Sequence, residues 1–201
     1  MNDIIRAACA VPDTAVANPE KNTERIIDFM LKAKEKNPDI VVFPELCITG
    51  YTCADLFFQQ ALLSHALKCL KKIILASEST EFITAVGLPL TLNGSLYNCA
   101  AVISGGKLWG IVPKTYIPTY NEFYERRWFT AGNKLKASEI KPSDIQISDI
   151  QSDSIPVGTD IIFDTGFFKF SAEICEDLWS VIPPSRYYAL GGAEVIINLS
   201  A

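Results

Sequence analysis

The sequence predicts a mixed α/β fold in which helices cover the outer side of a sheet. Apolar segments alternate with amphipathic ones early in the chain, give way to hairpin-forming segments, and alternate again near the end. This order, βαβα, then hairpins, then βαβ, is typical of a mixed sheet with helices packed on it. Hydrophobic residues make up 49% of the 201 residues, which suffices for the core of one domain.

The first part of the chain is predicted to alternate strands with amphipathic helices. Asn18 is a suitable N-cap for a helix whose first residue is Pro19, and the β-branched run at 40–43 has the composition of a buried strand. The expected elements are a strand at 4–11, a helix from Pro19 to shortly before Pro38, a strand at 40–43 and, after a loop at 44–53, a helix at about 55–77.

The remainder of the chain is predicted to consist mainly of strands. Gly105-Gly106 is a turn pair suited to a two-residue hairpin, and Pro183-Pro184 can begin a helix. The aromatic stretch 114–128 is expected to be an ordered loop, and the polar stretch 138–158 a surface excursion. The expected elements are strands at 82–88, 97–104 and 107–112, two strands flanking 164–166, a helix at 184–190 and a strand at 194–199.

Composition and charge exclude several classes of protein. The net charge is −5 and the acidic residues are dispersed, so no basic stripe is available for a nucleic acid backbone. The apolar runs are too short to cross a bilayer, and the first nine residues lack the features of a secretory signal. We therefore expect a cytoplasmic protein with no membrane or nucleic acid partner, whose six cysteines are free thiols.

Metal and histidine chemistry are not expected either. No pair of cysteines has the CxxC spacing of a zinc site and no histidine stands at ligand spacing, so no metal is predicted. The single histidine, His65, shares one side of its predicted helix with Lys68 and Lys72, which favours a solvated position. A Ser–His or Cys–His catalytic pair is therefore nearly excluded.

Three predicted strands each end at a side chain that can take part in covalent chemistry. These residues are Glu45, Lys114 and Cys175, and each directly follows an apolar run. Residues just beyond strand ends commonly form the site of an α/β sheet. If the three strands are neighbours, a carboxylate, an ammonium group and a thiol converge.

Together, these groups can hydrolyse an unactivated C–N bond without histidine or metal. A free thiol has a pKa of about 8.5 and needs a base or a nearby cation to become a ready nucleophile. Glu45 can take the proton of Cys175, return it to a leaving group and later activate water. Lys114 and the backbone N–H of Glu176 can stabilise the oxyanion of a tetrahedral centre.

Each of these residues also has a purely structural alternative. A lone cysteine near a strand end is usually a packing residue, a glutamate after a proline is usually a turn residue, and a lysine after a strand is usually solvated. The carboxylates of Glu176 and Asp177 can simply favour the N-terminus of the following helix. Spacing alone leaves these alternatives open.

Three local sequences resemble the motifs of the carbon–nitrogen hydrolase (nitrilase) superfamily, in the family's order. They are Phe43-Pro44-Glu45-Leu46, Pro113-Lys114-Thr115-Tyr116-Ile117-Pro118 and Glu173-Ile174-Cys175-Glu176-Asp177. The resemblance implies a four-layer αββα sandwich and a catalytic triad of Glu45, Lys114 and Cys175. Because family members continue well past Ala201, it also implies that the domain at 1–201 is truncated at its C-terminal part.

Longer stretches resemble the N-terminal glutaminase domain of glutamine-dependent NAD synthetase. They are the run from Pro44 to Phe57, the run from Tyr120 to Glu125 with Arg127-Trp128-Phe129, and Glu176-Asp177-Leu178-Trp179. The resemblance implies that the domain hydrolyses glutamine and needs no cofactor of its own. Ammonia would pass to a C-terminal synthetase domain, absent from this chain, which uses ATP and Mg to amidate deamido-NAD. The family acts in oligomers, so a homo-oligomer is expected.

The resemblance also adds three residues to the site. Tyr120 and Phe123 match family residues that line the glutamine pocket, and Glu125 matches a second glutamate near the triad. Packing under a loop is the alternative for the two aromatic residues. For Glu125 the alternative is a surface ion pair with Arg126 or Arg127.

Other features leave the function open. Thr115-Tyr116 departs from the family's pattern, because these residues are bulkier and more polar than the usual ones after the lysine. Tyr51, in the loop after Glu45, is a further candidate for substrate contact. Two alternative functions stay open: a free-standing amidase or nitrilase that acts on another small amide, and an idle fragment whose surface serves assembly.

Overall fold

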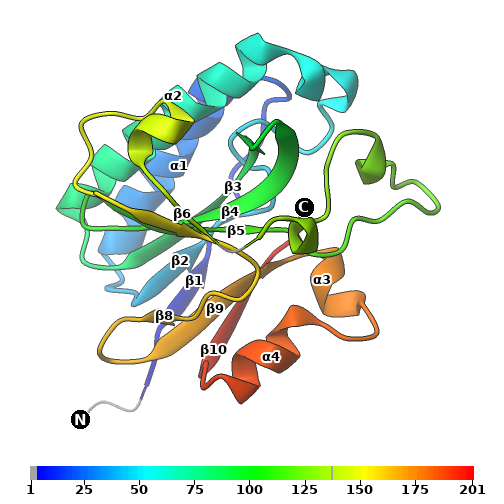
Figure 1. Ribbon diagram of the computed structural model, residues 1–201. Coiled ribbons are helices and arrows are strands. Elements are labelled where there is room, and N and C mark those ends of the chain that lie inside the picture. The colour runs from blue at the N-terminus through cyan, green and yellow to red at the C-terminus, as the bar shows by residue number, and fades with distance from the viewer. Residues whose placement is uncertain (1–3, 137) are drawn as a thin grey trace.

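The computed structural model describes residues 4–136 and 138–201, which form four layers (Figure 1). Two long helices cover one face of a seven-stranded sheet, and a three-stranded sheet packs on its other face. Two short helices lie on the outer side of the smaller sheet. The predicted αββα sandwich is therefore confirmed.

The larger sheet has the strand order β1-β2-β3-β4-β5-β7-β6. β1, β2 and β3 are parallel, and β3, β4 and β5 form two antiparallel hairpins. The residues after β2 and β5 therefore lie at the same edge. The bounds are β1 Ala7–Cys9, β2 Ile40–Val42, β3 Ile83–Leu92, β4 Ser95–Ser104, β5 Lys107–Pro113, β6 Ser138–Ile140 and β7 Ile155–Val157.

The smaller sheet has the order β10-β9-β8, with β9 and β10 parallel. Its strands are β8 Phe163–Asp164, β9 Lys169–Ile174 and β10 Val195–Leu199, and the short helices α3 (Glu176–Trp179) and α4 (Pro184–Leu190) connect β9 to β10. The long helices on the larger sheet are α1 (Pro19–Lys34) and α2 (Gln60–Ala76). Short 3₁₀ turns lie at Ala54–Phe58, Ser77–Ser79, Glu125–Arg127, Gly132–Lys134 and Pro142–Ile145.

Local signals explain where several elements begin and turn. The Asn18 side chain accepts a hydrogen bond from the backbone N–H of Lys21 at 3.1 Å, and Pro19 is the first residue of α1, as predicted. Gly105 and Gly106 both have positive φ, as a tight hairpin turn between β4 and β5 requires. The helix predicted at 55–77 is divided, because a 3₁₀ turn precedes α2.

The core occupies both sides of the larger sheet. Along β3, Val86 and Leu88 face the long helices, whereas Ala85 faces the smaller sheet. Burial on both faces explains why the central strands are apolar almost without interruption. Between the sheets, the rings of Phe163 and Phe170 stack with their centroids 5.0 Å apart.

The prediction of a surface excursion at 138–158 is wrong for part of that stretch. β7 pairs in parallel with β5 through Ile111 and Val157, and β6 pairs with β7, so both strands extend the larger sheet. Ile145, Ile147 and Ile155 are buried in the core against the helices. Polar residues separate these apolar ones, so the overall composition of the segment does not reveal that one side of it is buried.

The state of the cysteines and the character of the helices were both predicted from the sequence. All six cysteines are free; Cys9 is exposed, Cys175 is half-buried, and the other four are buried. Within 4–136 and 138–201, no helix has the length and apolar character needed to span a membrane.

Candidate active site

Glu45, Lys114 and Cys175 converge although the strands that precede them are not neighbours. Glu45 follows β2 and Lys114 follows β5, with β3 and β4 between them, whereas Cys175 follows β9 of the other sheet. The condition given for their convergence, that the three strands are neighbours, is therefore not the way in which the fold brings them together. The three segments meet because the two sheets pack face to face with these strand ends on the same side.

The Lys114 side chain is fully buried between two carboxylates. Its Nζ donates to Glu45 Oε1 at 2.7 Å and to the two oxygens of Glu125 at 2.7 and 2.9 Å. Burial acts to lower the pKa of Lys114, but the two carboxylates outweigh this effect and raise it. The lysine is therefore held as an ammonium ion, and the alternative of a solvated strand end is wrong.

Glu45 combines a fixed oxygen with a free one. Its Oε1 accepts from Lys114 and from Asn98 Nδ2, the latter at 2.6 Å, while its buried Oε2 has no partner among the described residues. Burial raises the pKa of Glu45; the charge of Lys114 opposes this shift and that of Glu125 adds to it. A buried carboxylate with a raised pKa and a free oxygen is well suited to accept a proton.

Glu125 belongs to the buried network rather than to the surface. Besides both hydrogen bonds from Lys114, it accepts one at 2.8 Å from the hydroxyl of Tyr51. Arg127 pairs instead with Asp55, at 2.6 and 2.7 Å. The surface ion pair is therefore the wrong alternative for Glu125, and the Tyr51 hydroxyl orients this carboxylate.

Cys175 lies at a strained turn between β9 and α3. Its φ of 44° and ψ of −99° are unusual for a residue with a side chain, and its N–H donates to Leu199 O at 3.0 Å. Burial, followed by the charge of Glu45, raises the pKa of the thiol to about 11, although Lys114 opposes the shift. Cys175 therefore keeps its proton at neutral pH, and Glu45 is the carboxylate whose charge acts most strongly on the thiol.

Asp177 connects the segments that carry Lys114 and Cys175. Its buried carboxylate accepts from the backbone N–H groups of Thr115 at 3.0 Å, Tyr116 at 2.7 Å and Ile174 at 3.0 Å. Burial raises its pKa to about 7 even though these bonds favour the charged form. The sequence pointed only to a role at the start of the helix, and the cross-links to Thr115 and Tyr116 were missed.

At two glycines, the backbone that carries a site residue lies so close that no side chain would fit between. A Cβ on Gly87 would lie 2.2 Å from Leu46 N and 2.8 Å from Glu45 Cα, and one on Gly132 would lie 2.7 Å from Lys114 O. The N–H of Gly132 donates to Lys114 O at 2.7 Å. Sequence reasoning missed both positions, since a glycine within a strand or loop gives no sign of what packs on it.

Glu45, Tyr51 and Ser200 are among the residues that line a cavity of about 330 Å³. This volume lies in the range of small-molecule sites, and the surface of the cavity is mainly apolar. Glu176 is the first residue of α3, where a helix N–H has no intrahelical acceptor, so the predicted oxyanion donor is available.

The predicted substrate residues Tyr120 and Phe123 lie outside this cavity. Their rings contact each other edge to face with centroids 5.7 Å apart, and the Tyr120 hydroxyl donates to Glu176 Oε2 at 2.6 Å. The ring of Tyr120 therefore lies beside α3, and its 49% exposure leaves room for a contact with another molecule.

Possible metal ligands gather away from this site. Single ligand atoms of Glu20, His65 and Cys69 lie within 4.8 Å of one another, a grouping that sequence spacing did not reveal. The His65 side chain is 44% exposed, in keeping with its predicted solvated position. Lys72 forms an ion pair with Glu20, so the carboxylate is already neutralised without a metal.

Comparison with known proteins agrees with this geometry. Residues 6–201 match the carbon-nitrogen hydrolase family. The chain is 34% identical over 199 residues to a glutamine-dependent NAD(+) synthetase of Mycobacterium tuberculosis, covering 98% of this chain and 28% of that protein. It is 33% identical over 184 residues to the Arabidopsis thaliana synthetase, covering 90% of this chain and 25% of that one.

A solved structure shows the same arrangement of elements. The crystal structure of a glutamine-dependent NAD(+) synthetase from Cytophaga hutchinsonii superposes with a TM-score of 0.82 and 28% identity. The match covers 98% of this chain and 30% of that protein. The chain thus spans less than a third of the length of each of these three relatives.

Proposed function

This chain belongs to the carbon-nitrogen hydrolase family, and from that premise we propose that it hydrolyses the side-chain amide of glutamine through a thioester at Cys175. The buried Glu45–Lys114–Glu125 network beside the strained cysteine is the observation that carries the proposal. The choice of glutamine as the substrate rests on the relatives named above, since their names describe glutamine-dependent enzymes.

The first half of the reaction forms the thioester. Glu45 takes the proton of the Cys175 thiol as sulfur attacks the amide carbon, so a C–S bond forms and the carbonyl becomes an oxyanion. Glu45 then gives that proton to the amide nitrogen. The C–N bond breaks, ammonia leaves, and the acyl group stays on sulfur.

The second half restores the enzyme. Glu45 takes a proton from water as the water oxygen attacks the thioester carbon, and it returns the proton to sulfur when the C–S bond breaks. The products are glutamate and the free thiol. The ammonium group of Lys114 and the N–H of Glu176 face the two oxyanions in turn, inside a site where burial strengthens their effect.

Recognition of the rest of the substrate is assigned to residues near the nucleophile. Tyr120 and Phe123 present an aromatic surface beside Glu176, which suits the aliphatic stem of glutamine. Glu125 holds Lys114 and contributes negative charge to the site, which favours a substrate ammonium group close by.

The proposal extends to the reaction that uses the ammonia. In this proposal the ammonia passes to a C-terminal synthetase domain that binds ATP and Mg and amidates deamido-NAD, whereas the hydrolase domain itself needs no cofactor. A homo-oligomer in the cytoplasm remains the expected state. The glutamine-dependent synthetases that resemble this chain support this pathway.

Labelling with a glutamine-derived electrophile tests the assignment of the nucleophile. Mass spectrometry should find the adduct on Cys175 and not on the exposed Cys9, which serves as an internal reference. The adduct should be lost in Glu45→Gln and kept in Glu81→Gln, a matched change at an exposed glutamate. Equal labelling of the two cysteines would overturn the activation of Cys175.

Ammonia release then identifies the substrate. We expect release from glutamine to exceed release from simple aliphatic amides by at least tenfold, because only glutamine offers charged groups to the site. Equal rates would instead indicate a general amidase. A chain that neither labels at Cys175 nor releases ammonia would contradict the proposed hydrolysis.

A further inference from the structure

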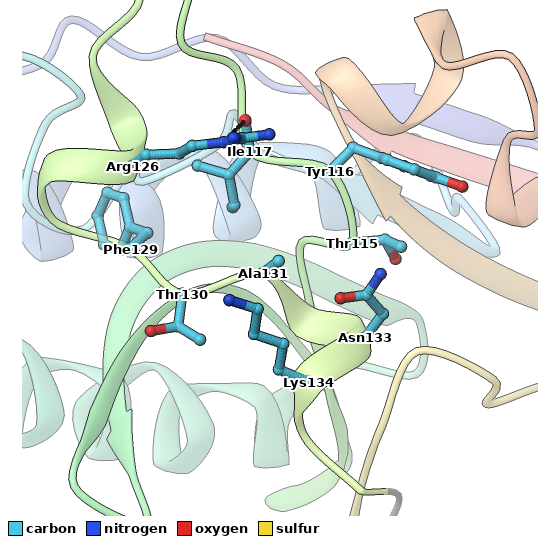
Figure 2. A pocket seen from close by; sticks show the side chains of 9 residues that line it. All are labelled: Thr115, Tyr116, Ile117, Arg126, Phe129, Thr130, Ala131, Asn133 and Lys134. Carbon is cyan, nitrogen blue, oxygen red and sulfur yellow. Dashed lines mark hydrogen bonds between the residues drawn. The ribbon is translucent and has the colours of Figure 1, made fainter.

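A second cavity, of about 490 Å³, lies next to the catalytic centre and is not used by the proposed mechanism. Its walls are the segment that follows Lys114 and the segment that follows Glu125 (Figure 2). Six of its lining side chains are polar: Thr115, Tyr116, Arg126, Thr130, Asn133 and Lys134. Lys114 itself is fully buried and does not line this cavity, so a molecule bound here would not contact its side chain.

Two cations face this cavity without an anionic partner. Figure 2 shows Arg126 on one wall and Lys134 on the opposite wall. Within the part of the chain that the structure describes, neither side chain forms an ion pair, and no carboxylate lines the cavity. The lining of the cavity therefore carries two positive charges and no negative one, although the chain as a whole has a net charge of −5.

The polar groups between the two cations are suited to a ligand as well. The Oγ1 atom of Thr115 is buried and has no hydrogen-bond partner among the described residues. Leaving a buried hydroxyl without a partner is unfavourable, unless a ligand supplies the missing acceptor. The side chain of Asn133 lies opposite this hydroxyl (Figure 2).

From these observations we propose that the cavity binds a small oxyanion of charge −2. The guanidinium group of Arg126 and the ammonium group of Lys134 match two negative charges, and the Thr115 hydroxyl donates to an oxygen of the ligand. Arg126 keeps its other role, because only its Nε is used to hold Ile117 O, at 3.2 Å. Phosphate monoesters and dicarboxylates share this chemistry.

A bound anion would join the two segments that frame the catalytic network. Gly132 already links them through its hydrogen bond to Lys114 O, and Asp177 holds the Thr115 and Tyr116 backbone from the other side. Arg126 directly follows Glu125 in the chain. The cavity therefore offers an effector a place to act on the lysine network without entering the site.

Calorimetric titration of the full chain with inorganic phosphate, and separately with succinate, tests the proposal at constant ionic strength. We expect saturable 1:1 binding of at least one anion, and a roughly tenfold weaker affinity in Lys134→Gln, since one charge-assisted contact is lost. Lys136→Gln is the matched control, because Lys136 lies two residues away and does not line the cavity. Tighter phosphate binding would indicate a phosphate monoester, and tighter succinate binding a dicarboxylate.

Thr115→Val distinguishes anion binding through specific contacts in the cavity from general electrostatic attraction to positive charge. It removes the unpartnered hydroxyl at nearly constant shape and charge, so it should weaken anion binding about fivefold without lowering the melting temperature. Unchanged affinity in Thr115→Val would overturn the proposal, as would equal weakening by Lys134→Gln and Lys136→Gln. Absence of saturable binding of either anion to the unmodified chain would overturn it outright.

Discussion

Replacing Gly87 with alanine tests how tightly the position of Glu45 depends on the bare backbone of β3. The new Cβ would lie 2.2 Å from Leu46 N, whereas ordinary van der Waals contact begins at 3.4 Å, so the two must separate by about 1.2 Å. The hydrogen bond from Lys114 to Glu45 is 2.7 Å long, and such bonds weaken beyond about 3.2 Å. The displacement therefore exceeds what this contact tolerates.

The expected result is a large loss of reactivity with a smaller loss of stability. A misplacement of about 1 Å in a catalytic group lowers rates by roughly 100-fold, so we expect that decrease in the alkylation rate of Cys175 by chloroacetamide. Overpacking of this kind costs about 1–3 kcal/mol in the free energy of unfolding. Peptide mass spectrometry measures the rate at Cys175 relative to the exposed Cys9 of the same molecules.

A second glycine provides the control for general overpacking. A Cβ on Gly110 would lie 2.8 Å from Phe163 Cε1 between the sheets and would not touch Glu45. Gly110→Ala should therefore lose comparable stability in urea unfolding and keep the reactivity of Cys175. The reasoning is refuted if Gly87→Ala folds with an unchanged rate ratio, or if Gly110→Ala lowers that ratio as strongly.

Three further predictions follow from burial and charge. Glu125→Gln should slow amide hydrolysis and move the acidic limb of its pH profile to lower pH, because the charge of Glu125 helps to raise the pKa of Glu45. A shift of the acidic limb to higher pH would contradict this. Asp177 has its pKa raised from 3.8 to about 7, so its protonated form stabilises the fold and this contribution is lost as the pH rises through that window. In urea unfolding, the stability of wild type relative to Asp177→Asn should fall between these pH values, and a constant difference would exclude the linkage. Phe170→Ala should lower the free energy of unfolding by about 3–5 kcal/mol, because the ring is fully buried between the sheets. Phe167 is half-exposed, so Phe167→Ala should change the free energy of unfolding by less than about 0.5 kcal/mol. Similar losses in the two variants would contradict the packing described.

Elements that depend on local signals could be predicted from the sequence. The cap at Asn18, the turn at Gly105-Gly106 and the strand predicted at 40–43 are each specified by neighbouring residues, and the structure has all three, with β2 ending one residue earlier at Val42. β7 could not be predicted, because its pairing with β5 joins residues more than forty positions apart. Its apolar residues are too few for a periodic pattern to identify the strand alone.

The same division holds within the site. Glu45, Lys114 and Cys175 stand at recognisable strand ends, so the chemistry of each suggested a role. Their positioning residues gave no such signal. Gly87 supports a turn some forty positions away, and Asp177 binds backbone groups about sixty positions earlier, so only the packing of distant segments reveals what these two residues do.

The attachment of Cys175 to β10 has a consequence for the order in which this turn acquires its structure during synthesis. The N–H of Cys175 is held by Leu199 O, and its carbonyl oxygen accepts from Asn198 Nδ2 at 3.4 Å. Both partners leave the ribosome more than twenty residues after the cysteine. In a nascent chain Cys175 therefore precedes both of its β10 partners, and its strained backbone geometry is fixed only when the strand translated after it docks beside β9.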